Sequence, residues 1–123
     1  MSKDSDAILL VDDDAAVRHS LKFSLELEGF DVRLYPTPEA LLQEHDLPAG
    51  GCLVIDYRMP EIDGLELVER LRARGVNLPV FLISGRVTRS LRARASSLGI
   101  ETVLEKPLSD LAARLRPVLD ARP

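Results

Sequence analysis

ILLVDDDAAV, residues 8–17, passes from four apolar residues directly into three carboxylates, Asp12, Asp13 and Asp14. A continuous apolar run is typical of a strand covered on both faces, whereas a strand with one solvated face would alternate. Adjacent carboxylates repel one another, and a charged group is costly to bury without a partner. The stretch therefore predicts a strand of a parallel sheet whose acidic end faces either water or a cation.

Apolar runs and helical patterns alternate along the rest of the chain. CLVID at 52–56 and LPVFLI at 78–83 are further apolar runs, and FDVRLY at 30–35 and TVLE at 102–105 predict two more strands. Apolar residues recur at helical spacing between them, and the second helix is expected to run to about residue 45. The residues expected to cap helices are Asp14, Thr37, Asp63 and Ser109. This alternation favours an α/β fold with a doubly wound, five-stranded parallel sheet of order 2-1-3-4-5.

Length and charge limit the function classes. With 123 residues, 46% hydrophobic and 29% charged, the chain has the size and composition of one globular domain, expected to span residues 1–123. Residues 1–64 carry 14 acids and five Lys or Arg, whereas the remainder carries six acids and 11 Lys or Arg. The acidic half would oppose docking on phosphates, so we expect no direct nucleic-acid binding.

The sequence also favours a cytoplasmic location. No apolar stretch approaches about 18 residues, the length that a membrane-spanning helix needs. The first residues, MSKDSD, are polar and acidic, unlike a secretory signal. The single cysteine, Cys52, cannot form an internal disulfide and is expected to be a small core residue. We therefore expect a cytoplasmic protein without membrane contact.

Reactive polar side chains stand at the ends of four expected strands. Asp12 and Asp13 end the first strand, Asp56 the third, Ser84 the fourth and Lys106 the fifth. In a doubly wound sheet these ends border one crevice, at the point where the strand order reverses. Clustered carboxylates raise one another's pKa unless a cation neutralises them, and an all-oxygen site with water suits Mg²⁺. We therefore expect the acidic residues of this crevice to face Mg²⁺.

A carboxylate, a metal ion, a hydroxyl and a lysine around one point favour phosphoryl transfer. Asp56 is expected to be ionised at neutral pH, so it can accept a phosphoryl group without a general base. Mg²⁺ and Lys106 would neutralise the phosphoryl oxygens, and the Ser84 hydroxyl would donate a hydrogen bond to one of them.

Two other function classes share parts of this pattern. An enzyme that hydrolyses phosphate esters through an aspartyl phosphate would need an acid two residues after the nucleophile, where this chain has Arg58. A flavin-binding module would have the same fold, but residues 12–14 are carboxylates where a phosphate-binding loop needs hydroxyls and glycines. Taken singly, tandem acids can be solvated helix caps and Ser84-Gly85 an ordinary turn, so only the combination favours phosphoryl transfer.

Five short motifs occur in order along the chain: VDDD at 11–14, VIDYRMP at 54–60, DG at 63–64, ISG at 83–85 and EKP at 105–107. In order and spacing they resemble the receiver domain of bacterial two-component response regulators. With its RMP and EKP motifs, the chain resembles in particular the receivers attached to LuxR-type regulators, such as those of nitrogen fixation. The resemblance covers residues 7 to about 120 and implies the flavodoxin-like receiver fold.

The resemblance implies a role for each acidic residue of the crevice. Asp56 is the expected phosphoacceptor and also a metal ligand. Asp13 is expected to bind Mg²⁺ directly, and Asp12 to act largely through water. The backbone carbonyl of Arg58 would complete the protein's share of the metal ligands.

The resemblance further implies a signalling domain that is not an enzyme in the usual sense. Ser84 matches the family's hydroxyl residue and Lys106 its phosphate-binding lysine, with a cis peptide bond expected before Pro107. A sensor histidine kinase or phosphotransfer protein would donate the phosphoryl group, and the domain would catalyse its own transfer and slow dephosphorylation. The downstream partner would be an effector protein or a C-terminal output domain, with dimerisation upon phosphorylation as a further expectation.

Two features bear on how the signal leaves the domain. Three residues before the lysine, where the family usually places Tyr or Phe, this chain has Val103. A valine is stiff and too short to swing between buried and exposed positions. We therefore expect the surface of the fourth helix, fifth strand and fifth helix to switch through displacement of residues 84–90. Arg86, Arg89 and Arg92 are expected on the outside of that helix, as a solvated face or a docking surface for an acidic partner.

Overall fold

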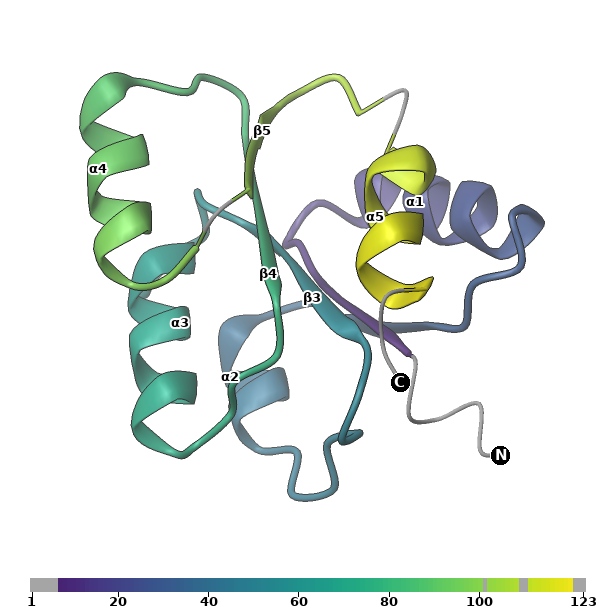
Figure 1. Cartoon of the computed structure of the whole chain (residues 1–123), viewed down its shortest axis with the longest axis horizontal. Helices are drawn as coiled ribbons and strands as arrows, with labels where there is room; N and C mark the ends of the chain where they lie inside the picture. Colours follow the sequence, from purple (N-terminus) through teal and green to yellow (C-terminus); the bar gives the residue numbers. More distant parts are fainter. Residues whose placement is uncertain (1–6, 101, 109–110, 121–123) are drawn as a thin grey trace.

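The computed structural model describes residues 7–100, 102–108 and 111–120, in which five strands alternate with five helices (Figure 1). The strands are β1 (Ile8–Val11), β2 (Val32–Tyr35), β3 (Cys52–Asp56), β4 (Val80–Ser84) and β5 (Thr102–Glu105). The helices are α1 (Ala15–Leu27), α2 (Pro38–Leu42), α3 (Gly64–Ala73), α4 (Arg89–Ser97) and α5 (Leu111–Asp120). None of the described helices is long and apolar enough to span a membrane.

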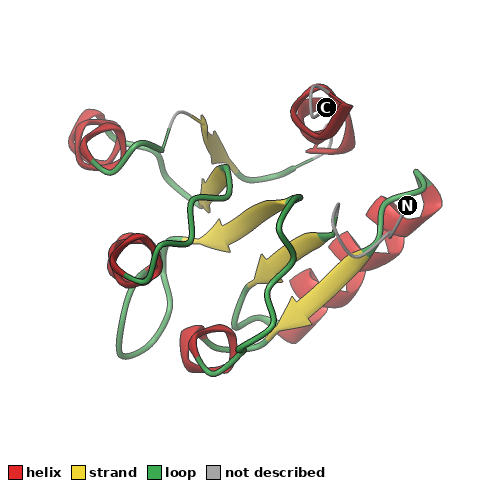
Figure 2. Cartoon of the chain, turned by 60° about the horizontal axis from the view of Figure 1, so that its bottom comes forward, coloured by secondary structure: helices red, strands yellow, loops and turns green. Residues whose placement is uncertain are grey.

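The strands form one parallel sheet of order β2-β1-β3-β4-β5, which confirms the predicted doubly wound fold. Figure 2 shows the strand arrows pointing the same way, with helices on both sides of the sheet. Val11 of β1 lies opposite Ile55 of β3, and Ser84 of β4 lies opposite Glu105 of β5. This register brings the C-terminal ends of these strands to one edge of the sheet.

Two buried apolar layers explain why the central strands lack alternation. α1 and α5 cover one face, where Leu25 and Leu115 belong to a buried cluster with Ile8 and Leu10. α2, α3 and α4 cover the opposite face, where Leu9 belongs to a second cluster. Figure 1 shows the first pair of helices on the right of the sheet and the other three on the left. Successive side chains of β1 therefore enter different layers, and both layers require apolar residues.

Helix caps agree with the predictions wherever the structure describes them. Asp14 caps α1 through its side chain, and Thr37 caps α2. Asp63 forms a reciprocal capping box with Glu66 at the start of α3. The expected cap Ser109 lies outside the described residues.

Several element boundaries differ from the sequence-based expectation: β2 is Val32–Tyr35 instead of 30–35, β4 is Val80–Ser84 instead of 78–83, and two helices differ further. α2 ends at Leu42 rather than near residue 45, because QEHD at 43–46 carries no apolar side chain to bury. α4 begins only at Arg89, because the Thr88 side chain accepts a backbone N–H of its first turn and caps the helix there. Arg86, predicted on this helix, therefore belongs to the loop before it.

Candidate functional site

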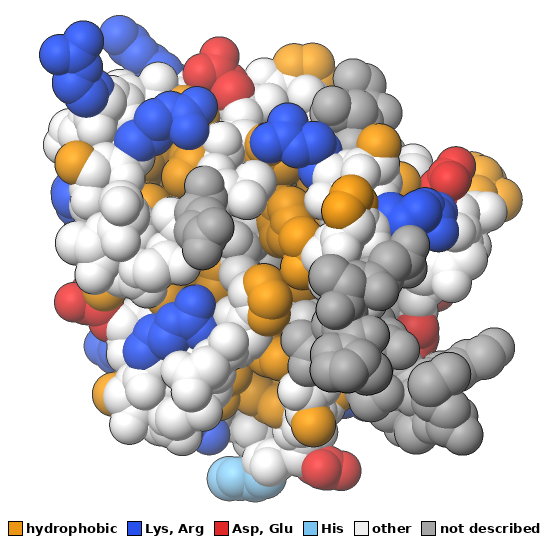
Figure 3. Space-filling model, in the orientation of Figure 1, with side chains coloured by type: hydrophobic (Ala, Val, Ile, Leu, Met, Phe, Trp, Pro, Cys, Tyr) orange, Lys and Arg blue, Asp and Glu red, His pale blue; other side chains and the backbone are white. Residues whose placement is uncertain are grey.

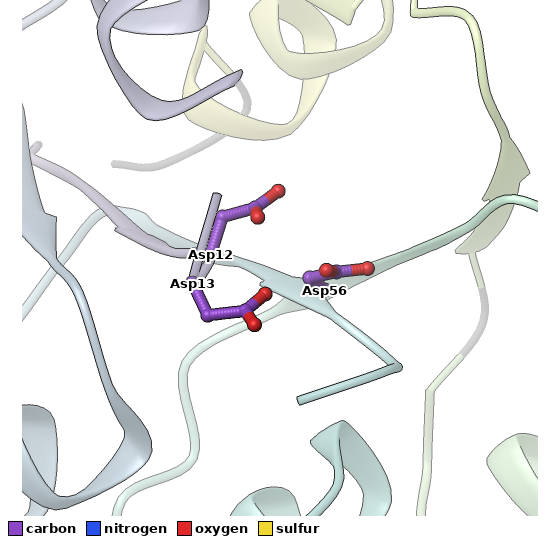
Figure 4. A group of neighbouring side chains, drawn as sticks. All are labelled: Asp12, Asp13 and Asp56. Carbon is purple, nitrogen blue, oxygen red and sulfur yellow. The ribbon is translucent and has the colours of Figure 1, made fainter. Parts of the chain in front are cut away.

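Three carboxylates gather at the C-terminal edge of the sheet. Asp12 and Asp13 follow β1, and Asp56 is the last residue of β3. One oxygen of each lies within 4.8 Å of the others, and Figure 4 shows the three side chains drawn together. Asp12 is fully buried and Asp56 is only 5% exposed, whereas Asp13 is exposed. The predicted acidic cluster is therefore present, with Asp13 on its open side.

Asp12 is held by contacts of its backbone and of one carboxylate oxygen. Its N–H donates to the Tyr35 carbonyl at 3.3 Å, and its carbonyl accepts from the Arg18 guanidinium at 2.8 Å. Asp12 Oδ1 accepts the backbone N–H of Asp14 at 3.0 Å. The other oxygen, Oδ2, is buried without a hydrogen-bond partner in the described part of the chain. A buried anionic oxygen of this kind is costly unless a cation approaches it.

The N-terminus of α3 packs closely behind Asp56. The Tyr57 N–H donates to the Ile83 carbonyl, and the Gly64 N–H donates to the Tyr57 carbonyl, both at 2.8 Å. A Cβ on Gly64 would lie 2.8 Å from the Asp56 carbonyl oxygen and 3.0 Å from Tyr57 Cα. Such a position leaves no room for a side chain, which explains the glycine after the capping residue Asp63. Asp56 is thus anchored by β4 and α3 together.

Lys106 supplies a positive charge between the two buried carboxylates. Its Nζ lies 3.6 Å from Asp56 Oδ1 and 3.7 Å from Asp12 Oδ2, which are ion pairs longer than hydrogen bonds. Its backbone N–H donates to the Ser84 carbonyl at 2.9 Å. The peptide bond between Lys106 and Pro107 is cis, as predicted. The structure therefore brings this lysine to the predicted place.

Ser84 lies at the expected strand end and is buried, but its hydroxyl turns into its own loop. Ser84 Oγ donates to the Arg86 carbonyl at 2.9 Å and accepts the Arg86 N–H at 3.3 Å. The predicted hydroxyl is therefore near the site while engaged elsewhere. The residue type indicates a hydrogen-bonding group but not the rotamer in which it is held.

The electrostatics of Asp56 fit a site for a divalent cation. Burial raises the pKa of Asp56 from 3.8 to about 6, and the Asp12 charge is the next largest cause. Lys106 and a hydrogen bond from the Arg58 backbone lower that pKa, while Asp13 raises it. A cation would relieve the repulsion between carboxylates and supply a partner for Asp12 Oδ2. This all-oxygen donor set, open on one side, suits Mg²⁺.

The raised pKa of Asp56 predicts a pH-dependent loss of stability without metal. The folded state binds a proton more tightly than the unfolded state, so this stabilisation is complete below about pH 4 and lost as the pH rises past about 6. In EDTA, the free energy of unfolding of Asp56→Asn should not fall over this pH range, because the amide does not ionise. At about pH 7 the variant should therefore be more stable than wild type by up to about 3 kcal/mol. Urea unfolding at both ends of this range measures the difference. The same substitution at the exposed Asp31 is the control, and equal behaviour of the two variants would contradict the prediction.

The approach to the cluster is open. A surface depression of about 450 Å³ beside it is lined by Asp13, Tyr57, Arg58, Met59, Pro60 and Asp63. The Arg58 side chain is exposed at this mouth. The acidic cluster is therefore accessible from solvent on the side of Asp13.

A contact beside the site was not predicted from the sequence. Arg94 Nη1 of α4 donates to the Tyr57 hydroxyl at 3.1 Å, and the guanidinium carbon lies 6.0 Å from the centre of the tyrosine ring. Tyr57 directly follows Asp56, so the contact joins the end of β3 to α4. The two residues stand 37 positions apart, and neither belongs to a pattern that would pair them.

Comparison with known proteins agrees with this geometry. A family model described as the response regulator receiver domain matches residues 8–116. The transcriptional regulatory protein FixJ of Bradyrhizobium diazoefficiens is 40% identical over 103 residues, which cover 84% of this chain and 50% of that protein. Response regulator MprA of Mycobacterium avium is 41% identical over 116 residues, which cover 91% of this chain and 50% of that protein.

The same similarity appears in three dimensions. A crystal structure of FixJ-N is similar with a TM-score of 0.84 at 30% identity, covering 96% of each chain. The chain spans about half the length of the two curated relatives.

Proposed function

The chain belongs to the family of response regulator receiver domains of two-component signalling, and on this premise we propose that Asp56 is its phosphoacceptor. The proposal rests on one observation above all. Asp56 is a buried carboxylate with the Lys106 ammonium 3.6 Å away, inside an acidic cluster that fits a divalent cation. A nucleophile and the positive charge for a transferred phosphoryl group therefore occupy one place.

In the proposed reaction, an ionised oxygen of Asp56 attacks the phosphorus of a phosphohistidine on a sensor histidine kinase or phosphotransfer protein. A phosphorus–oxygen bond forms while the phosphorus–nitrogen bond breaks, and the electron pair leaves with the imidazole nitrogen. Because the pKa of Asp56 is about 6, most molecules carry an ionised carboxylate at about pH 7. No separate base is then required, and the domain catalyses its own phosphorylation.

Asp12, Asp13, Asp56 and the Arg58 backbone carbonyl are the proposed holders of Mg²⁺, with Asp12 acting largely through water. When bound, the ion supplies neutralising charge to the phosphoryl oxygens. Lys106 would neutralise a further oxygen from its position between the two buried carboxylates.

Acetyl phosphate, a small phosphodonor, tests the proposal without a kinase. Intact-mass measurement should show one phosphoryl adduct when Mg²⁺ is present, because the site residues suffice for transfer. Excess EDTA should abolish the adduct, because the three carboxylates would then repel the incoming anion. Undiminished labelling in EDTA would contradict the metal role of the acidic cluster.

Two exposed arginines, Arg58 two residues after Asp56 and Arg86 two residues after Ser84, predict a long-lived phosphoryl group. Arg58 and Arg86 would screen the acyl phosphate from water, and neither side chain offers a base to activate that water. We expect Arg58→Ala/Arg86→Ala to lose its phosphoryl group severalfold faster than wild type. Arg70→Ala/Arg92→Ala removes the same charge from exposed positions of α3 and α4 and should keep the wild-type rate. Equal or slower loss from the first variant would contradict the screening role.

We place this receiver as a single domain over residues 1–123, acting in the cytoplasm without binding nucleic acid itself. Slow self-dephosphorylation would end its signal. Its downstream partner would be an effector protein or an output domain in the same polypeptide, since the matched residues make up only 50% of each curated relative. Phosphorylation-dependent dimerisation is part of the same proposal.

Because this chain has Val103, we propose that phosphorylation changes the protein surface through displacement of the β4–α4 loop. The residue is 6% exposed and belongs to the core cluster beneath α2, α3 and α4, where a short β-branched side chain cannot change position. Binding of Mg²⁺ and beryllofluoride should therefore shift NMR signals of residues 84–90 strongly and the Val103 methyls little. Val103→Ala should retain this response. Large changes in the Val103 methyl signals, with unchanged signals for residues 84–90, would contradict this proposal.

The surface that such a displacement would move is rich in arginine. Arg86, Arg89 and Arg92 are exposed, and Figure 3 shows Lys and Arg side chains gathered over the corner of the molecule where α4 lies. A shift of the β4–α4 loop would therefore reposition positive charge at the protein surface. This positive surface supports a downstream partner protein whose own surface is acidic, because opposite charges would then face each other.

A further inference from the structure

Glu105, the last residue of β5, accepts a hydrogen bond from the loop that leads from β4 to α4. It lies opposite Ser84 in the sheet register, and its Oε1 accepts the backbone N–H of Val87 at 3.0 Å. Its side chain is exposed, so packing in the core does not account for its position. The contact joins the residue before Lys106 to the middle of the 84–88 loop.

Ser84 forms further hydrogen bonds to the backbone of the same loop. Its hydroxyl bonds both the N–H and the carbonyl of Arg86. Between the strand and this contact, a Cβ on Gly85 would meet nothing within 4 Å. Beyond it, the Thr88 side chain caps α4. The loop is therefore held by these polar contacts together with the packing of Val87 against the core cluster beneath α2, α3 and α4, and it leads directly into α4.

Resting on the proposed phosphorylation of Asp56, we propose that Glu105 is a positioning residue that holds Ser84 away from the acceptor in the unphosphorylated protein. To donate to a phosphoryl group on Asp56, the Ser84 hydroxyl must give up the Arg86 carbonyl, and the loop must move with it. The hydrogen bond from Val87 to Glu105 opposes this movement. Its loss lowers the free energy of the activated conformation relative to the resting one.

Two variants separate the hydrogen bond from simple charge. Glu105 is an anion near the place of an anionic phosphoryl group, so its removal would also reduce repulsion. Glu105→Gln removes the charge but keeps a carbonyl oxygen for the Val87 N–H, whereas Glu105→Ala removes both. Glu26→Ala removes the same charge from α1, which lies on the opposite side of the sheet from α4 (Figure 1), and is the matched control.

Beryllofluoride with Mg²⁺ stands in for the phosphoryl group in the test, and an NMR titration measures its affinity. We expect Glu105→Ala to bind it about twofold to tenfold more tightly than wild type, the range of one hydrogen bond. Glu105→Gln and Glu26→Ala should stay close to wild type. In the wild-type protein, hydrogen exchange of the Val87 amide should be slow before beryllofluoride is added and faster afterwards.

Three results would overturn the inference. They are equal affinity of Glu105→Ala and wild type, equal tightening in Glu105→Ala and Glu105→Gln, or a Val87 amide that stays protected in the bound form. The last measurement needs no variant, so it decides even where a substitution impairs folding. Failure of the proposed function is distinguishable, because the wild-type protein would then not bind beryllofluoride at all.

Discussion

Asp56→Asn is expected to take up no phosphoryl group from acetyl phosphate, even with saturating Mg²⁺. The amide that replaces the carboxylate is neutral and has no anionic oxygen to attack phosphorus. It is nearly the same size as the carboxylate and removes a buried charge whose pKa is raised to about 6, so the variant should fold at least as well as wild type. Intact-mass spectrometry of both proteins, incubated in parallel, measures the loss.

Asp14→Asn is the matched control for this experiment. Asp14 belongs to the same acidic run, but its side chain accepts backbone N–H groups at the start of α1 instead of facing the cluster. Asn caps helices as well as Asp does, so this variant should fold and be labelled like wild type. Full labelling of Asp56→Asn would place the acceptor on another residue.

Gly51→Ala is expected to be the most destabilising single substitution among those considered. Gly51 precedes β3 with a φ of 96°, and an added Cβ would collide with the carbonyl oxygen of Ala7 beside β1. The obstacle is backbone where the two central strands β1 and β3 begin, and backbone cannot rotate away as a flexible side chain can. Strain at a positive φ and overpacking together should cost about 2–6 kcal/mol. That is a large part of a typical domain's stability.

Gly75→Ala separates the backbone conformation from the collision. Gly75 follows α3 with a φ of 83°, but a Cβ there would meet nothing within 4 Å. Its substitution should cost only about 1–2 kcal/mol, from the left-handed conformation alone. Urea unfolding of the two variants gives the comparison. Equal destabilisation would mean that the contact between residue 51 and Ala7 carries no energetic weight.

Local physics made the strands and caps predictable from the sequence. Ile8–Val11 is apolar at every position, and such a run has a low free energy only where both faces are covered. Asp14, Thr37 and Asp63 bond backbone groups two or three residues away, so their roles depend on neighbours in the chain. The strand order required only that crossovers be right-handed and that two layers of helices cover the sheet.

By itself, then, the sequence determined the parallel sheet and the edge at which Asp12, Asp56 and Lys106 meet, because strand ends in such a sheet share one edge. Only the tertiary structure decided how those groups are arranged there. The burial of Asp12 Oδ2 without a hydrogen-bond partner and the raised pKa of Asp56 both arise from burial in the folded protein. Two further contacts depend on side-chain torsions: the hydrogen bond of the Ser84 hydroxyl to Arg86, and that of the Val87 N–H to Glu105. Residue type does not specify these torsions, and they are selected only when the strands and loops are packed together.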